Sequence, residues 1–320
     1  MSEFVFGTNN AAFVQVMYEE YLRDPAAVSP EWRQLFDNGR MAELPIIPTT
    51  RAEASGSGMR NAGSVTTPAP THPASPIPTP GGTPITGPAA RLVQNMTESL
   101  TVPTATSFRD VTVIALDARR RTLNAQLAAS GKKISFTHLI GYAIVQAAKR
   151  FPVMTHAFAE ADGKPHRYDP HGVNLGLAVD VERKDGTRGL VVPVIKHAEQ
   201  MDFAQFYATY ETLVEKARTN KLLPDDFAGA TISLTNPGTI GTVASVPRLM
   251  KGQGSIIATG AIRDVAGAKL MTVTSTYDHR IIQGAESGMF LRQIDGLLQG
   301  ADEFYGSVSG SLGLKGSGSR

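Results

Sequence analysis

The sequence predicts a mixed α/β domain that is preceded by a short helical segment and a linker. Alternating apolar stretches typical of strands, the clearest at 173–181, are interleaved with longer stretches typical of helices, such as 135–151. Ten of the 20 prolines fall between residues 41 and 88, and this stretch separates the α/β domain from the N-terminal residues.

The composition narrows the class of protein. Lysine plus arginine number 31 against 29 acidic residues, so no nucleic-acid partner is expected. No apolar stretch reaches the roughly 18 residues of a membrane span, and no secretory signal is expected at the N-terminus, so we expect a cytoplasmic protein. The chain has no cysteine, which excludes disulfides, thiolate metal sites and a cysteine nucleophile.

Residues 1–40 are predicted to be a helical docking segment of two short helices. Phe13, Met17 and Tyr21 recur at four-residue spacing, and a Ser-Pro pair ending at Pro30 begins the second helix. The segment is too small to bury a core alone, so we expect it to dock on something else. Two amphipathic surface helices are the alternative.

Two other zones have a biased composition. Residues 41–88 are rich in proline, alanine and threonine and are predicted to be a disordered linker, because such a stretch cannot repay its ordering entropy by burial. Residues 306–320 are rich in glycine and serine and are predicted to be a disordered tail.

Residues 89–305 are predicted to form the globular domain. The predicted strands are 111–116, 173–181, 189–195, 230–235, 255–259 and 270–277. The predicted helices are a basic one from Asp117 and those at 135–151, 203–221 and 286–298. Pro193 indicates an edge strand or a bulge, because proline cannot donate to a sheet.

His279 is the first candidate for chemistry. It follows the strand 270–277, and Arg280 and then Gly284 lead into the last helix. An imidazole titrates near neutral pH, so His279 is a candidate general base, although a surface histidine in a strand-to-helix loop fits the same pattern. The other histidines need no chemical role: His138 is predicted to be a core residue. His72 lies in the proline-rich stretch, and four others lie in loops or at element ends without metal-ligand spacing: His156, His166, His171 and His197.

A second candidate lies where the strand 230–235 ends. Thr235 and Asn236 precede a Pro-Gly turn, with a further glycine at Gly241. A hydroxyl in this position could donate a hydrogen bond to an oxyanion that develops during a reaction. The alternative is a threonine-rich solvent face followed by an ordinary turn.

Several motifs together resemble a known family. They are Ala105–Val111, Arg150–Pro152, Arg188–Val194, Ser233–Gly238 and Tyr277–Arg280, in that order and spacing. The domain is similar to the catalytic domain of the dihydrolipoamide acyltransferases, which are relatives of chloramphenicol acetyltransferase. The resemblance implies a two-layer α/β sandwich of the chloramphenicol acetyltransferase type.

The order of the zones resembles a narrower group, the actinobacterial multifunctional 2-oxoglutarate enzymes. There, a helical segment like that of the decarboxylase component precedes a linker and a succinyltransferase-type domain without its own lipoyl domain. Residues 18–25 and 30–32 match the first segment. The thiamine-dependent decarboxylase that follows in that group has no counterpart, so the resemblance implies no thiamine diphosphate or Mg²⁺ for this stretch of sequence.

The resemblance implies a reaction and its residues. His279 is expected to deprotonate the thiol of coenzyme A, which attacks the thioester of succinyl-dihydrolipoamide, and Thr235 is expected to stabilise the oxyanion. The expected supporting residues are Asn236, Asp278, Arg280 and Gln283. The family forms homotrimers with the site between subunits. The implied partners are the lipoyl-bearing acyltransferase and decarboxylase components of 2-oxoacid dehydrogenase complexes.

Gln283 departs from the family pattern. The family has His-Arg-x-x-Asp-Gly, and its aspartate pairs with an arginine on the first helix to brace the histidine loop. Here Gln94 or Asn95 falls at the arginine position, so an amide pair could keep the brace. Two alternatives stay open: a non-catalytic trimeric scaffold that docks the decarboxylase component, and acetyl rather than succinyl transfer.

Overall fold

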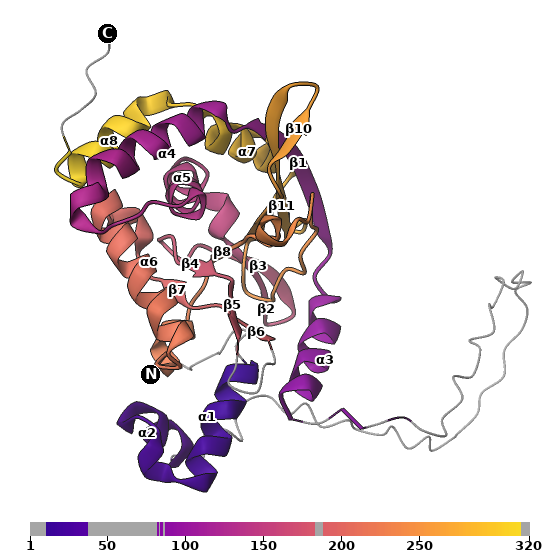
Figure 1. Ribbon diagram of the computed structural model, residues 1–320. Coiled ribbons are helices and arrows are strands. Elements are labelled where there is room, and N and C mark those ends of the chain that lie inside the picture. The colour runs from indigo at the N-terminus through magenta and orange to yellow at the C-terminus, as the bar shows by residue number, and fades with distance from the viewer. Residues whose placement is uncertain (1–10, 38–81, 83, 86, 183–187, 315–320) are drawn as a thin grey trace, which may run out of the picture.

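The computed structural model describes most of the chain (Figure 1). The described residues are 11–37, 82, 84–85, 87–182 and 188–314. Nearly all of the predicted linker, and the tail beyond residue 314, lie outside the described residues.

The centre of the domain is a seven-stranded mixed sheet in the order β1-β11-β9-β8-β4-β7, with β10 paired to β11. Its strands are β1 (Thr104–Thr112), β4 (Leu175–Leu177), β7 (Val194–Ile195), β8 (Ile232–Thr235), β9 (Ser255–Thr259), β10 (Arg263–Val265) and β11 (Ala268–Asp278). β8 is parallel to β4 and β9, whereas the β1–β11, β9–β11, β10–β11 and β4–β7 pairs are antiparallel.

Strand β11 shows why the sheet has one helix-covered face. Met271, Val273 and Tyr277 alternate along it and belong to the main hydrophobic core. Ser275 takes the one remaining place in this series, whereas Thr272, Thr274 and Thr276 alternate with it, and Thr274 donates a hydrogen bond to the Ser245 carbonyl on the opposite face. The two-residue period of the strand therefore places apolar side chains under the helices and hydroxyls on the other face.

Five helices of the domain form the layer over the apolar face of the sheet (Figure 1). They are α4 (Ile114–Leu127), α5 (Phe136–Arg150), α6 (Phe203–Arg218), α7 (Gly284–Leu298) and α8 (Phe304–Ser311). Ten of the 15 residues of α5 are buried, which agrees with its nearly continuous apolar sequence and its central position. The predicted two-layer α/β sandwich is confirmed.

Two hairpins stand apart from the main sheet. The first pairs β2 (Ala157–Ala161) with β3 (Lys164–Tyr168), and the second pairs β5 (Val179–Glu182) with β6 (Arg188–Val191). The sequence did not predict the first hairpin. Its turn is Asp162-Gly163, with φ values of 52° and 68°, and Asp-Gly is a strong hairpin signal that could have revealed it.

Three strand predictions need correction. The strand predicted at 111–116 is β1, which ends at Thr112, because α4 already begins at Ile114. The stretch 173–181 is divided between β4 of the main sheet and β5 of the second hairpin. The stretch 189–195 is divided between β6 and β7, and the break falls at Val192-Pro193, where the proline cannot donate to either ladder.

The predicted disordered tail, 306–320, is wrong for its first nine residues. Helix α8 runs through Ser311, its Val308 is fully buried, and Leu312 and Leu314 pack against the core. Val308 and Leu312 are four residues apart, so the apolar residues share one helix face although glycine and serine dominate the composition.

The N-terminal residues form two helices, as predicted: α1 (Ala11–Arg23) and α2 (Pro30–Asp37), with a short 3-10 turn between them at Pro25–Ala27. A further helix, α3 (Gly87–Ser99), leads into β1 and packs against α1. Within the described residues, no helix is long and apolar enough to cross a membrane.

Candidate active site

His279 lies directly after β11, at the start of the turn that leads to α7. Its backbone N–H donates to the Pro103 carbonyl at 2.9 Å, which ties the turn to the residue before β1. The imidazole is exposed, and its centroid lies 5.5 Å from that of the Tyr277 ring. The backbone at His279 is therefore held in place while the ring faces solvent.

Asp278 and Arg280, the residues on either side of His279, form an ion pair with each other. Asp278 is only 2% exposed, and its carboxylate accepts hydrogen bonds from Arg280 N, Nε and a terminal guanidinium nitrogen at 3.1, 2.9 and 2.6 Å. The Arg280 guanidinium also lies 3.8 Å from the centroid of the Phe158 ring of β2. A buried acid is stable when it is paired and hydrogen-bonded in this way, and the pair fixes the shape of the turn.

Gln283 is the N-cap residue of α7. Its backbone N–H donates to Oε2 of Glu286 at 2.7 Å, and the residue is exposed. On α3, Gln94 Nε2 donates to Glu98 Oε1 at 3.3 Å. The predicted amide contact between Gln283 and Gln94 or Asn95 stays a prediction.

A cleft of 440 Å³ lies between the β2–β3 hairpin and the His279 turn. Its lining residues are Phe158, Pro165, His166, Arg167, Arg280, Ile281, Gln283 and Glu286. Arg280 is already paired with Asp278, whereas Arg167 makes no ion pair with any residue in the described ranges. The cleft therefore contains, next to the turn of the candidate base, a guanidinium that forms no ion pair within the described residues, and sequence reasoning missed this feature together with the hairpin.

Thr235 and Asn236 end β8 on a fixed turn. Asn236 Nδ2 donates to Thr137 Oγ1 in the first turn of α5 at 3.0 Å. Gly238 follows in a 3-10 turn (Pro237–Ile240), where a Cβ atom would lie 2.3 Å from the backbone of Gly260. Only glycine permits this approach, and it holds the end of β8 against the residue that follows β9.

The sheet register separates the two candidate groups within one chain. Thr235 pairs with Ala258, and Ala258 pairs with Thr274 of β11. His279 lies five residues beyond Thr274, which is roughly 16 Å along the strand at about 3.3 Å per residue. Asp278, Arg280 and Gln283 thus gather around His279 at one end of the sheet, while Thr235 and Asn236 lie at the other end.

The remaining histidines differ from His279 in their surroundings. His138 is buried, as predicted: Ser135 N donates to its Nδ1 at 3.1 Å, and its Nε2 lies 2.8 Å from Glu211 Oε1. Burial lowers the pKa of His138 to about 4. His156, at the base of the hairpin, lies 3.6 Å from Asp169, and burial lowers its pKa as well.

Two known families match the chain. Residues 80–305 match the 2-oxoacid dehydrogenases acyltransferase (catalytic domain), and residues 2–42 match the 2-oxoglutarate dehydrogenase N-terminus. The two matches cover the α/β domain and the N-terminal helices, respectively.

Two curated relatives that are similar to the chain carry the same name. The chain is 56% identical over 243 residues to the "Multifunctional 2-oxoglutarate metabolism enzyme" of Mycolicibacterium vanbaalenii, which covers 71% of the chain and 20% of the relative. It is 54% identical to the protein of that name from Mycobacterium sp. (strain JLS), over 71% of the chain and 19% of the relative. The chain thus spans about a fifth of the length of these relatives.

Solved structures share the fold. A probable dihydrolipoamide acetyltransferase from Listeria monocytogenes superposes with a TM-score of 0.60 at 22% identity, covering 75% of this chain and 98% of the other. The dihydrolipoamide acetyltransferase of Azotobacter vinelandii gives 0.61 at 27% identity, covering 72% and 99%. That second structure comes from a study of the roles of a serine, a histidine and an asparagine in catalysis, the last two four residues apart.

Proposed function

Because the chain belongs to the 2-oxoacid dehydrogenase acyltransferase family, we propose that it transfers a succinyl group from dihydrolipoamide to coenzyme A, with His279 as the general base. The observation that carries the proposal is the His279 turn, where a rigid backbone presents an exposed imidazole beside a basic cleft. The succinyl group is favoured over acetyl because the curated relatives are named for 2-oxoglutarate metabolism.

The proposed reaction has one tetrahedral intermediate. His279 takes the proton of the coenzyme A thiol, and the thiolate forms a bond to the thioester carbonyl carbon of succinyl-dihydrolipoamide. The carbonyl oxygen becomes an oxyanion, which accepts a hydrogen bond from the Thr235 hydroxyl. The intermediate collapses by breaking the bond to the dihydrolipoyl sulfur, which receives the proton from His279. No enzyme nucleophile is needed, in agreement with a chain that has no cysteine.

The proposed site is shared between two chains of a homotrimer. Thr235 and His279 of one chain lie at opposite ends of the sheet, so they cannot act on the same carbonyl. A neighbouring chain that places its Thr235 end opposite the His279 turn supplies the missing hydrogen-bond donor. Asn236, which anchors that end of β8 to α5, acts as a positioning residue.

Gln283 is compatible with this proposal. In the Azotobacter vinelandii study, the histidine and the asparagine whose catalytic roles were addressed are four residues apart. The same spacing separates His279 from Gln283, so an amide side chain in this place has a counterpart in a relative. Asp278 and Arg280 are proposed to hold the turn rather than to carry protons, since each is bound to the other.

Coenzyme A is proposed to enter through the cleft beside the hairpin. Its phosphates are anionic, and Arg167 and His166 provide cationic or hydrogen-bonding groups there. The dihydrolipoamide is proposed to come from the lipoyl domain of a partner acyltransferase, which a decarboxylase component loads with the succinyl group. The proposed location of the reaction is the cytoplasm.

The test is an acyl-transfer assay on the purified chain. Coenzyme A is mixed with either succinyl- or acetyl-dihydrolipoamide, and formation of acyl-coenzyme A is followed. We expect succinyl-coenzyme A as the main product. A preference for the acetyl donor would overturn the proposed succinyl specificity but not acyl transfer itself. If neither donor gave a product, the result would favour a non-catalytic scaffold.

A further inference from the structure

The N-terminal helices rest on a specific part of the acyltransferase domain. The indole Nε1 of Trp32 donates to the Leu222 carbonyl at 2.9 Å, and Trp32 is only 1% exposed. The Phe227 ring lies 5.2 Å from that of Phe13 and 6.5 Å from that of Trp32. One ring from each helix therefore meets the same phenylalanine, and a buried hydrogen bond fixes the position of α2.

The two helices depend on this contact. Helix α2 has eight residues, and a helix of that length is not stable alone in water. Its Trp32 and Phe36 rings lie 5.4 Å apart, and the Phe36 ring contacts that of Tyr18 on α1 at 5.2 Å. This aromatic cluster joins the helices to each other, and only the domain completes the burial of Phe13 and Trp32.

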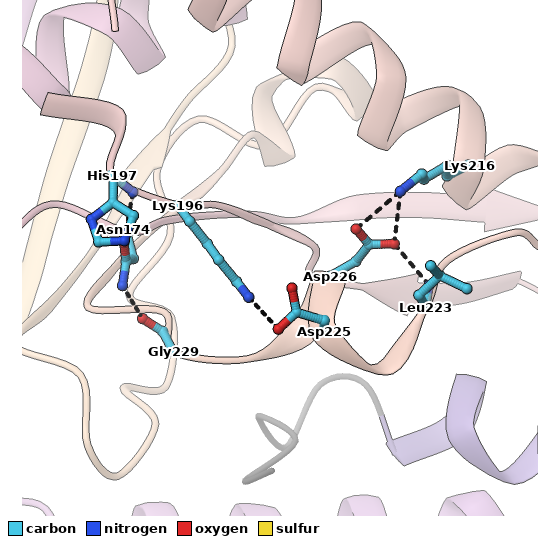
Figure 2. Close-up of polar contacts among 8 residues, drawn as sticks. All are labelled: Asn174, Lys196, His197, Lys216, Leu223, Asp225, Asp226 and Gly229. Carbon is cyan, nitrogen blue, oxygen red and sulfur yellow. Dashed lines mark hydrogen bonds and ion pairs between the residues drawn. The ribbon is translucent and has the colours of Figure 1, made fainter. Parts of the chain in front are cut away.

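Residues 222–229, which we call the platform, are held by the domain independently of α1 and α2 (Figure 2). Lys216 of α6 contacts both carboxylate oxygens of Asp226 at 3.1 and 3.2 Å. Asp226 also accepts from Leu223 N at 2.8 Å, and Lys196 contacts Asp225 at 2.5 Å.

The far end of the platform is fixed as well. Asn174 Nδ2 donates to the Gly229 carbonyl at 2.8 Å, and Asn174 Oδ1 accepts from His197 N at 2.9 Å (Figure 2). These partners come from α6 and from the segments around β4 and β7, not from the N-terminal helices. The platform is therefore preorganised, which lowers the entropic cost of binding a partner.

We propose that the platform is a docking site for the chain's own N-terminal helices, bound in cis, with Trp32 as the anchor residue. The site accepts a segment of the 2-oxoglutarate dehydrogenase N-terminus type, which residues 2–42 match, and it is formed by a domain of the acyltransferase family. It lies beside β7, at the edge of the sheet opposite β1 and β11, so docking and acyl transfer can be tested separately.

Trp32 reports on docking, because it is the only tryptophan of the chain. In the parent chain we expect blue-shifted emission and little quenching by acrylamide. Phe13→Ala removes the ring that contacts Phe227, and we expect a red shift and a several-fold rise in quenching. The matched control is Leu22→Ala on the same helix, since Leu22 is 64% exposed and should leave the emission unchanged.

The platform side has its own pair of variants. Phe227→Ala should expose Trp32 as Phe13→Ala does. Phe304→Ala truncates an equally buried ring that packs on Tyr142 and Tyr305, and it should leave the emission unchanged. Circular dichroism of each variant checks that the domain is folded. Ready quenching of Trp32 in the folded parent chain would overturn docking, as would equal emission of the Phe227→Ala and Phe304→Ala variants.

Cross-linking distinguishes cis from trans binding. Glu31 and Lys221 are exposed, and they precede the two residues joined by the Trp32–Leu222 hydrogen bond. In the cysteine-free chain, Glu31→Cys with Lys221→Cys provides two thiols for a short bismaleimide. We expect a linked single chain that migrates faster than the unlinked chain on a denaturing gel, and either single variant as control should not show this shift. A ladder of linked chains would overturn binding in cis.

Discussion

The first turn of α5 and the turn after β11 each contain a histidine, but the two imidazoles have opposite surroundings. His138 is 3% exposed and lies between the rings of Tyr207 and Tyr210, with centroids 4.8 and 4.4 Å away. Both of its ring nitrogens have partners from its own chain. His279 is exposed, and within the described residues it is held by a hydrogen bond from its backbone N–H to the Pro103 carbonyl.

Burial and hydrogen bonding of the ring determine whether a histidine is available for chemistry. A buried imidazole with both nitrogens engaged is held neutral and stabilises the fold, as at His138. The imidazole of His279, by contrast, is exposed on a braced turn, where a substrate can reach it. The brace is formed by the two neighbours, Asp278 and Arg280, and the exposed ring of His279 takes no part in it.

The largest effect is expected from His279→Ala. Loss of a general base lowers turnover by about two to four orders of magnitude, and the fold should be unchanged because the ring is exposed. The measurement is the rate of succinyl transfer, with circular dichroism as the check on folding. His138→Gln is the matched control and should retain transfer at pH 7.5. Near-full activity of His279→Ala would remove it from the mechanism.

Thr235→Ala is expected to have the next effect, a loss of about two to three orders of magnitude, the usual cost of one oxyanion donor. The variant also tests whether the site is shared, because the Thr235 that acts with His279 is proposed to come from another chain. Chains with Thr235→Ala and chains with His279→Ala are each inactive alone. In randomly mixed trimers, about a quarter of the sites combine an intact histidine with an intact threonine.

The mixing experiment therefore has a clear readout. Co-expressed chains carrying different tags are purified as mixed trimers, and their activity is compared with each single variant. Recovery toward a quarter of the parent activity supports a shared site. Activity no higher than that of the single variants contradicts it, provided that mixed trimers are isolated.

The sequence predicted the elements of this site better than their arrangement. The patterns around Thr235 and His279 placed both residues at strand ends, and those strands are β8 and β11. The pattern could not tell that the register places them at opposite ends of the sheet, because register depends on pairing between distant segments. The Arg280–Phe158 contact was missed for the same reason, since it joins a turn to a hairpin 122 residues earlier in the chain.

Composition misled at the C-terminal end of the domain. The region after residue 305 is rich in glycine and serine, yet Val308 is fully buried in α8. A few apolar residues at helical spacing are enough when a neighbouring surface, here α6, needs to be covered. Local propensity gives no information about such a surface.

Asp278→Asn is expected to lower turnover by a smaller factor, about ten- to a hundredfold. The change keeps the shape but weakens the hydrogen bonds to Arg280, and a misplacement of about 1 Å can cost a hundredfold in rate. The KM for coenzyme A should change less than kcat. Asp295→Asn, which weakens the Arg109 ion pair on α7, is the control and should leave kcat unchanged. Equal effects of the two variants would contradict a positioning role for Asp278.

The smallest effect expected at pH 7.5 concerns His138, whose contribution appears in the dependence of stability on pH. Its pKa is about 4 in the fold and near 6.5 in the unfolded chain, because burial of the ring disfavours its charged form. Glu211 beside Nε2 is half exposed, so water screens its charge and burial prevails. Between pH 6.5 and pH 4, the unfolded chain therefore binds a proton at His138 that the folded chain does not bind. The stabilisation is fully present above pH 6.5 and is lost as the pH falls toward 4, by about 3 kcal/mol at most.

His138→Gln should flatten this part of the stability profile. The variant loses the acceptor for Ser135 N–H, so it starts less stable at pH 7.5, but it has no imidazole to protonate between pH 6.5 and 4. Urea unfolding at a series of pH values measures both effects. His166→Gln, at an exposed position on β3, should keep the slope of the parent chain. A parent-like slope for His138→Gln would mean that other groups set the acid sensitivity, and it would remove the contrast between a histidine that stabilises the fold and one that is free to react.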